Sequence, residues 1–425
     1  MKIIISVISI LLIIILVSGG CAWKSGEMLK GILLGDRMRF EDGYKYFSWC
    51  AGGVPLVDRL RKLLNRDYII LLQNNNELRA SGGFMGSYAK LKFRQGVLVD
   101  AKISDIYNPD GQLIGYVEPP PPVKKAFDFG GWKLRDSNWD IDFTKAAPQI
   151  AWFFEQGLEP TDGLVAINLS LVQKILKITG PVGEISDKNI WQLAQTQAEV
   201  NMQKQNFLTE IGLNLLSEFK QLTYPKLLKI LMLVYQELRN KQILVWMKDL
   251  TVQQILHTKS WDGSLGEPTN GYLYIVDSNL GANKANCCVT RSVVQEIDDD
   301  QIKLTITYKN DNEFKDPKPP VFWGGDYINY VRVVIPANSF VDSPEDYDIE
   351  DRDSFKILGK WIHIPAQKTE SIEIKYKHKE INSVFIKRQP GIESFDYKLV
   401  YNGKIVVNKK IIADELLNYG SSTGN

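Results

Sequence analysis

Residues Leu71–Phe84 read LLQNNNELRASGGF, and the change of character within this stretch decides how the chain is organised. The apolar run Tyr68–Leu72 breaks abruptly into a polar segment that contains three asparagines, Glu77 and Arg79. Two glycines then open a second apolar segment. Short apolar runs that are bounded by turn residues predict buried strands. The polar segment is therefore predicted to be a loop at a sheet edge, where glycines allow a sharp turn or the close approach of a ligand.

The N-terminus carries an uncharged apolar run, Ile3–Val17, after a single lysine. The run predicts a secretory signal, and it is short against the ~20 residues that a spanning helix needs. The small residues before Cys21 resemble a bacterial lipobox, which predicts a lipid on Cys21, and an uncleaved membrane anchor is the alternative. Both options hold the protein to the cell membrane on its extracytoplasmic side. We assign residues 1–21 to this signal or anchor.

Composition excludes some classes of protein. The 425 residues carry 51 Lys and Arg against 50 Asp and Glu, so no basic surplus indicates nucleic-acid binding. Ten Trp and eighteen Tyr are expected to pack in the core, ahead of stacking on carbohydrate. Three cysteines remain after Cys21, which is no disulfide framework. Cys287 and Cys288 fall on a predicted strand and are expected to point to opposite faces as independent small hydrophobes; a vicinal disulfide is the alternative.

The remaining chain divides into three parts. Residues 22–65 have helical periodicity and are predicted to form a membrane-proximal helical segment. Strand and helix patterns alternate over 66–265, which predicts an α/β layer domain. Short strands separated by turn residues dominate 266–425, which predicts an antiparallel β-sandwich-like domain. The run Pro119–Pro122 is expected to be a stiff polyproline II connection rather than helix, with a partner-docking site as the alternative.

Acidic residues gather in LRDSNWDIDF, Leu134–Phe143. The spacing of Asp136 and Asp140 copies the start of a calcium loop, but Ile141 stands where the loop needs glycine, so an EF-hand is excluded. A looser Mg²⁺ or Ca²⁺ site that uses Asp136, Asp140 or Asp142 is one hypothesis. The alternative is that these acids complement the N-terminal end of the helix that follows.

Two arginines form the strongest candidate ligand site. Arg79 and Arg135 each follow an apolar segment and lie beside a carboxylate, Glu77 and Asp136 respectively. The guanidinium fork grips phosphate or carboxylate with two hydrogen bonds, and loops at one edge of an α/β sheet are the expected place for a ligand. The alternative is a pair of structural ion pairs, Arg79 with Asp136 or Glu77 with Arg135.

Several motifs together resemble the bacterial domain of unknown function 4012 family. They are QNNNELRASGGFMGSY from Gln73, LRDSNWDIDF from Leu134, DGLVAIN from Asp162, TGPV from Thr179, NLGANKANCCVTR from Asn279, YVRVVIPANS from Tyr330 and FIKRQPG from Phe385. The resemblance implies a single-anchor envelope protein and gives no activity.

The order of these features is also similar, more distantly, to the LytR-CpsA-Psr family, which transfers glycopolymers from a polyprenyl pyrophosphate carrier. That resemblance implies that Arg79, Arg135 and Lys204 contact the lipid phosphates and that Asp136 binds Mg²⁺ or acts as a base. The acid that this family carries after its first arginine is missing, because Ala80–Gly82 stands there.

Two functions follow from these patterns. The first is an envelope protein that binds an anionic ligand such as a cell-wall polymer, and the second is a transferase that acts on a polyprenyl-linked glycopolymer. Convergence of Arg79, Arg135 and Asp136 on one open groove would favour the transferase. Burial of the guanidinium groups in pairs with Glu77 and Asp136 would count against it.

Overall fold

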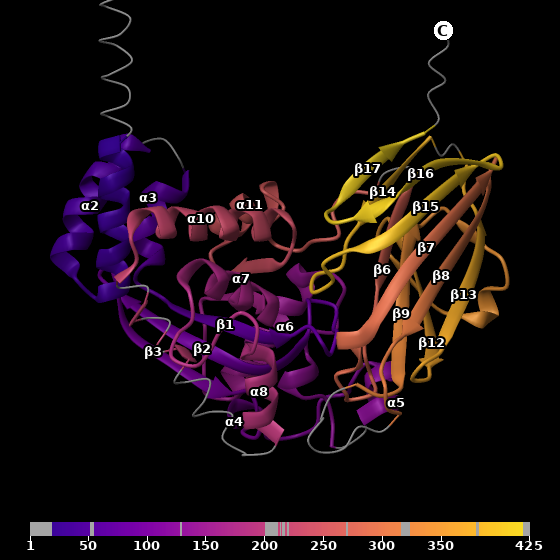
Figure 1. The fold of residues 1–425 in the computed structure, drawn as a ribbon, viewed down its shortest axis with the longest axis horizontal. Coiled ribbons are helices and arrows are strands. Elements are labelled where there is room, and N and C mark those ends of the chain that lie inside the picture. The colour runs from indigo at the N-terminus through magenta and orange to yellow at the C-terminus, as the bar shows by residue number, and fades with distance from the viewer. Residues whose placement is uncertain are drawn as a thin grey trace, which may run out of the picture.

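A computed structural model describes residues 19–51, 55–127, 130–199, 211–212, 214, 217–218, 221–268, 271–315, 324–379 and 382–419. Within these ranges the chain forms the expected mixed α/β region followed by a strand-rich region (Figure 1). The apolar run Ile3–Val17 and Lys204 lie outside the described residues. None of the described helices is both long and apolar enough to cross a bilayer.

The first domain is built on a five-stranded sheet in the order β3-β2-β1-β4-β5. β1 and β4 run parallel, and the other neighbours are antiparallel. Side chains alternate along β1, so Ile69 and Leu71 face one side and are buried. The strands are β1 (Asp67–Asn74), β2 (Phe84–Arg94), β3 (Val97–Asp105), β4 (Gly163–Asn168) and β5 (Ile243–Met247).

Helices cover both faces of this sheet. α6 packs Ala147 and Ile150 against Ile69 and Leu71, and α7 lies along the opposite face (Figure 1). Asp142 caps α6 by accepting a hydrogen bond of 2.9 Å from the amide of Thr144. The helices of this domain are α4 (Tyr107–Asp110), α5 (Pro121–Phe127), the 3-10 turn η1 (Leu134–Asp136), α6 (Phe143–Gln156), α7 (Leu169–Thr179), α8 (Ile190–Glu199), α10 (Tyr224–Arg239) and α11 (Leu250–Thr258).

The second domain is a sandwich of two six-stranded sheets, β10-β13-β8-β7-β15-β16 and β11-β12-β9-β6-β14-β17. Each sheet contains one parallel pair, β15 with β7 and β14 with β6, so the predicted antiparallel arrangement holds for all neighbours but these. Side chains from both sheets share one core. The elements are β6 (Tyr272–Val276), η2 (Ala285–Cys288), β7 (Val289–Asp298), β8 (Gln301–Asn310), β9 (Tyr327–Pro336), β10 (Phe340–Val341), η3 (Pro344–Asp346), β11 (Asp348–Arg352), β12 (Phe355–Ile364), β13 (Thr369–Lys377), β14 (Ser383–Lys387), β15 (Phe395–Tyr401), β16 (Lys404–Ile411) and β17 (Glu415–Asn418).

The predicted membrane-proximal segment is helical. Residues 19–34, α2 (Arg37–Cys50) and α3 (Pro55–Leu63) pack on the first sheet through a cluster in which Phe40 and Leu64 meet Val97 of β3. Cys21 forms a disulfide with Cys50, across 6.0 Å between the Cα atoms. The sulfur of Cys21 cannot carry a disulfide and a thioether-linked lipid at once, so the two are chemical alternatives.

Two sequence expectations need correction. Cys287 and Cys288 are joined in a disulfide rather than acting as independent hydrophobes, because they lie in the 3-10 turn η2 and the strand begins only at Val289. Pro121 and Pro122 begin α5 instead of extending a polyproline II connection. A proline is tolerated in the first turn of a helix, where its missing N–H has no intrahelical acceptor.

The loop 75–83 joins the two domains. The amide of Leu78 donates to Asn286 Oδ1 at 3.1 Å, and the amide of Asn279 donates to the carbonyl of Leu78 at 3.0 Å. Gln389 Nε2 donates to the carbonyl of Arg79 at 3.0 Å. The segment after β1 is therefore polar because its backbone amides and carbonyls form hydrogen bonds with the sandwich.

Two glycines allow the closest approach in this joint. Gly391 has φ +86°, and a Cβ built there would lie 2.0 Å from the carbonyl oxygen of Gly82. Gly82 itself has φ +130°. Both positions thus need a residue without a side chain, for backbone conformation and for space.

We expect Gly391→Ala to lower the midpoint of thermal unfolding much more than Gly403→Ala. Gly403 has φ +73°, but nothing lies within 4 Å of the place that a Cβ would take, so it reports the conformational cost alone, about 1 kcal/mol. Gly391→Ala adds a backbone clash across the joint. Equal midpoints in calorimetry would show that the joint is not closely packed at this point.

Candidate functional site

Arg79 lies in the joint and faces no open space. Its side chain is 2% exposed, and its Nη2 lies 3.1 Å from Glu77 Oε1 and 3.3 Å from Asp136 Oδ1. Its Nη1 donates to the carbonyls of Leu78 and Asn279. The arginine is therefore shared between two carboxylates of its own domain and a carbonyl of the sandwich, which is the structural ion-pair alternative.

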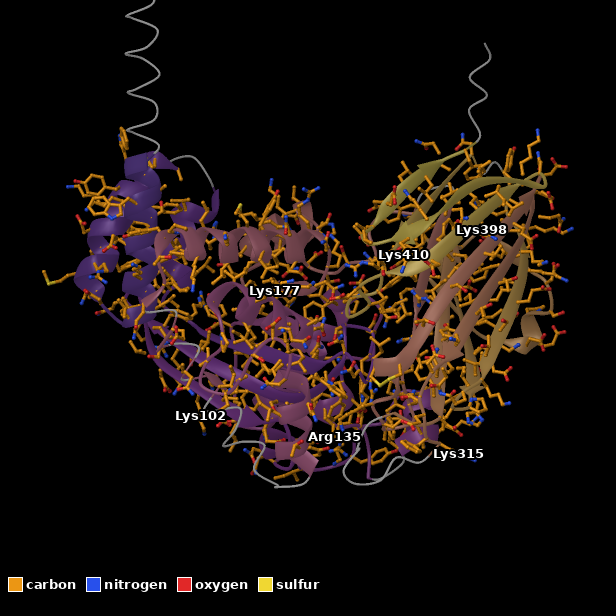
Figure 2. The ribbon with its side chains drawn as sticks, viewed as in Figure 1. Lys102, Arg135, Lys177, Lys315, Lys398 and Lys410 are labelled. Carbon is orange, nitrogen blue, oxygen red and sulfur yellow. A yellow bond between two sulfur atoms is a disulfide. The ribbon has the colours of Figure 1, made fainter. Side chains whose placement is uncertain are left out.

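Arg135 is also neutralised by carboxylates. It hydrogen-bonds Asp110, and its Nε lies 3.7 Å from Asp136 Oδ2. It remains partly exposed on the lower side of the molecule (Figure 2). Glu77, Asp110 and Asp136 thus supply carboxylates to both guanidinium groups, so each arginine already has an anionic partner within the protein.

Burial dominates the protonation of Glu77. Loss of hydration raises the pKa of Glu77 above its ordinary value, although the nearby Arg79 and Lys284 lower it. The folded chain therefore holds the Glu77 proton more tightly than the unfolded chain does. This contribution to stability is lost as pH rises from about 4.5 through the raised pKa.

The predicted metal ligands have other partners. Asp140 Oδ1 lies 2.6 Å from Arg352 Nη1 of the sandwich, and Asp142 caps α6 as described. Asp136 lies between the two arginines. In the part of the chain that the structure describes, no three acidic, His or Cys side chains are grouped to hold a metal ion.

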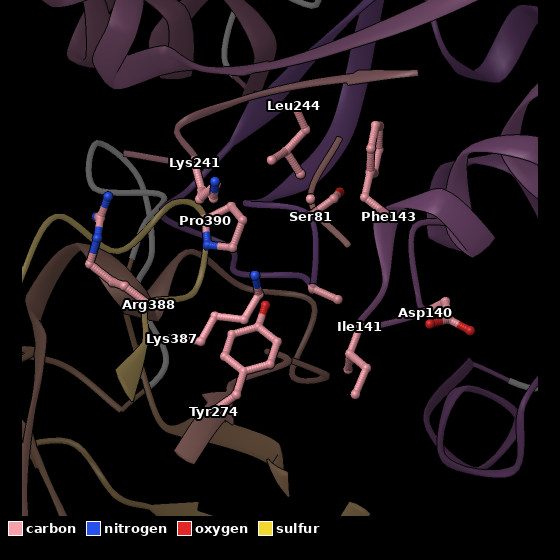
Figure 3. A pocket seen from close by; sticks show the side chains of 12 residues that line it. Ser81, Asp140, Ile141, Phe143, Lys241, Leu244, Tyr274, Lys387, Arg388 and Pro390 are labelled. Carbon is pink, nitrogen blue, oxygen red and sulfur yellow. The ribbon is translucent and has the colours of Figure 1, made fainter. Parts of the chain in front are cut away.

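Several cationic side chains line a small cavity near the joint. Lys241 reaches it from above, and Lys387 and Tyr274 from below (Figure 3). The cavity has about 10 Å³ of free space, which suffices for roughly one water. Lys241 donates to the carbonyl of Ser260, and Lys387 donates to that of Ser264 at 2.8 Å. The two lysines hold loops together through these hydrogen bonds. The cavity is too small for a ligand larger than a water molecule.

A much larger groove of about 560 Å³ opens where the domains meet beside α5. Its aromatic wall is made of Trp139 from the first domain and of Tyr330 and Trp361 from β9 and β12. The ring centroids of Trp139 and Tyr330 are 5.7 Å apart, and those of Tyr330 and Trp361 are 5.4 Å apart. These spacings are those of tilted and edge-to-face aromatic pairs.

Charged groups flank the aromatic wall with both signs. Asp348 and Glu350 of β11 supply carboxylates, and the ammonium of Lys125 in α5 lies 5.0 Å from the Trp361 ring centroid. Asp348 accepts a hydrogen bond of 2.9 Å from the Tyr330 hydroxyl. Burial and this carboxylate together raise the pKa of Tyr330, so its hydroxyl stays protonated and fixed.

Arg332 supports the wall from behind. Its guanidinium carbon lies 4.1 Å from the Trp139 ring centroid, and its Nη1 donates to the Trp139 carbonyl at 2.8 Å. Burial lowers the pKa of Arg332 to about 10, which leaves the group charged at neutral pH. The contact holds Trp139, a residue of the first domain, against the sandwich.

Gly359 makes room for the central ring. A Cβ at Gly359 would lie 2.0 Å from the Tyr330 hydroxyl oxygen. The Tyr330 ring can therefore lie across β12 only because this position has no side chain.

Sequence patterns do not reveal this groove. Tyr330 and Trp361 fall on predicted strands, whose aromatic residues are expected to pack in the core, and Pro119–Pro122 is expected to be a surface connection. The sequence offers no local motif that joins these segments, which lie about 200 residues apart.

The fold defines a protein with an α/β region followed by a β-sandwich, and a groove of about 560 Å³ opens where the two meet. Residues 65–202 match the family model described as "Protein of unknown function (DUF4012)", which supports the resemblance noted from the motifs. No curated protein and no solved structure matches the chain. The matched segment contains Trp139 and Lys125. The resemblance to the LytR-CpsA-Psr family is not shown by these comparisons.

We expect Arg79→Met to destabilise the fold by about 3–5 kcal/mol, because Glu77 and Asp136 would then be buried without a counter-charge. Arg94→Met is the matched control, since Arg94 makes an exposed ion pair with Asp67 at 2.6 Å. Its loss is expected to cost less than about 1 kcal/mol. Chemical denaturation of both variants provides the comparison, and similar midpoints would contradict a structural role for Arg79.

Proposed function

We propose that this is a membrane-held, extracytoplasmic envelope protein that binds a glycan in the groove at the domain joint. The observation that carries the proposal is the three-ring wall of Trp139, Tyr330 and Trp361 with carboxylates at its edge. A sugar ring has an apolar C–H face that packs on an aromatic ring, and its hydroxyls donate to carboxylates. A groove of about 560 Å³ lies within the usual size of ligand sites.

The charges of the groove favour a ligand with many hydroxyls over a polyanion. Asp348 and Glu350 are matched in the described lining by Lys125 and Arg332, so the groove has no surplus of positive charge to hold a phosphate chain. The anionic ligand expected from Arg79 and Arg135 therefore has weaker support than a neutral or weakly charged saccharide. The proposal keeps the cell-wall polymer as ligand and moves its site from the arginines to the aromatic wall.

The transferase alternative has less support. It requires Arg79, Arg135 and Asp136 to converge on an open groove, whereas Arg79 is buried between Glu77 and Asp136. A lipid pyrophosphate would have to displace both carboxylates before it met the guanidinium group.

Two features support an extracytoplasmic location. The apolar run Ile3–Val17 precedes the described chain, and two disulfides join the four cysteines. Disulfides persist in oxidising compartments and are rare in the cytosol. The pairing of Cys21 with Cys50 favours the uncleaved anchor over the lipoprotein.

Trp361→Ala is expected to weaken binding of soluble, enzymatically released cell-wall glycan fragments about tenfold, because one stacking face is lost. Trp152→Ala is the control, since Trp152 is a partly exposed tryptophan of α6 outside the groove. Calorimetric titration measures both. Unchanged affinity in Trp361→Ala, or no glycan binding by the native chain, would overturn the proposal.

Peptide mapping of the membrane-extracted protein under non-reducing conditions separates the two kinds of anchor. We expect one disulfide-linked species that contains Cys21 and Cys50. A mature chain that begins at Cys21 with a thioether-linked lipid would instead establish the lipoprotein.

A further inference from the structure

α10 has two apolar faces, and one of them stays largely exposed. Leu227 and Ile230 are buried against the domain. The opposite face repeats at intervals of three and four residues, as neighbours on one side of a helix do. Its apolar members are Leu228 (58% exposed), Leu231 (43%), Met232 (51%) and Tyr235 (52%).

The charges on this helix are of one sign where they meet solvent. Lys229 and Arg239 are exposed, whereas the ammonium of Lys226 donates to the carbonyl of Thr179 at 2.7 Å. The single acid of α10, Glu237, is buried and lies 3.1 Å from Lys174 Nζ. An exposed helix face that combines leucine, methionine and tyrosine with basic residues has the composition of helices that lie in a membrane interface.

The start of α10 lies beside the start of the described chain. The Tyr224 hydroxyl bonds to Glu27, and Lys30 Nζ lies 4.5 Å from the Tyr224 ring centroid. Gly26 also abuts this ring. Gly26 and Glu27, which contact Tyr224, lie about seven residues after Gly19 on the N-terminal helix. Because a helix rises 1.5 Å per residue, the start of α10 lies beside a point roughly 10 Å along that helix from Gly19. The apolar run Ile3–Val17 ends two residues before Gly19.

Exposed aromatic residues surround the same point. Trp23 is 53% exposed and Trp49 is 72% exposed, and the disulfide between Cys21 and Cys50 keeps them near each other. Lys24 Nζ lies 5.1 Å from the Trp23 ring centroid. Tryptophan and tyrosine gather at membrane–water interfaces, where one part of the ring is apolar and another wet.

We propose that the exposed face of α10, with Trp23 and Trp49, lies in the headgroup region of an anionic bilayer, with the helix parallel to the membrane surface. The occupant is the bilayer that holds the N-terminal apolar run, and charge complementarity comes from Lys229 and Arg239. α10 and α11 lie above the first sheet, on the same side of it as the start of the described chain, and α5 lies on the lower side of the molecule (Figure 1). This contact turns the glycan groove away from the membrane.

The inference goes beyond glycan binding and rests on the proposed anchoring. The full chain, reconstituted in phosphatidylglycerol–phosphatidylethanolamine vesicles, is tested with a nitroxide on Met232→Cys and, as control, on Ile114→Cys. Ile114 is 97% exposed and lies in the loop before α5. We expect the label at 232 to lose collisions with a polar nickel reagent while keeping those with oxygen. The label at 114 should stay open to nickel.

Three other outcomes overturn the inference in different ways. A label at 232 that meets nickel as freely as the one at 114, in chain that floats with the vesicles, leaves the anchor standing and removes α10 from the membrane. Loss of both nickel and oxygen collisions shows that protein, such as a second copy, covers the face. A chain that does not float removes the anchor as well. The glycan-binding proposal is tested separately by titration, so none of these outcomes decides it.

Discussion

The buried guanidinium of Arg79 is the interaction on which the arrangement of the two domains depends. A charge removed from water needs partners with good geometry, or it destabilises the fold. Arg79 finds them in Glu77, Asp136 and the Asn279 carbonyl, which come from three separate segments. The loop after β1 is therefore polar because it is an internal surface between domains.

The same constraint positions the groove. Asp136 is fixed by Arg79, and three residues later Trp139 stacks on Arg332 of the sandwich. Asp140 then pairs with Arg352. A short acidic and aromatic segment is thus held at successive points by cations of both domains. The aromatic wall is preorganised by these contacts, which lowers the ordering cost of binding a ligand.

Local features are predictable from the sequence, and contacts between distant segments are not. The continuous apolar run Tyr68–Leu72 and the acid before α6 predict the strand and the helix start correctly, because both depend on neighbours within a few residues. Arg79 looks like a ligand-binding residue in the sequence because its partner at Asn279 lies 200 residues away. The prediction for Pro121 is wrong for a different reason, since a proline that starts a helix and one that prevents it look the same in isolation.

The joint has a consequence for the order of events during synthesis. Gln389 bonds to the Arg79 carbonyl across 310 residues of sequence. At about 5–20 residues per second, the ribosome needs roughly 15–60 s to make the second partner after the first. During that interval the first sheet can form, and Asn279 and Asn286 are made, but the contact of the loop 75–83 with Gln389 is still missing. The nascent first domain therefore leaves the ribosome with a polar, hydrated loop that gives up the last of its water only when Gln389 arrives.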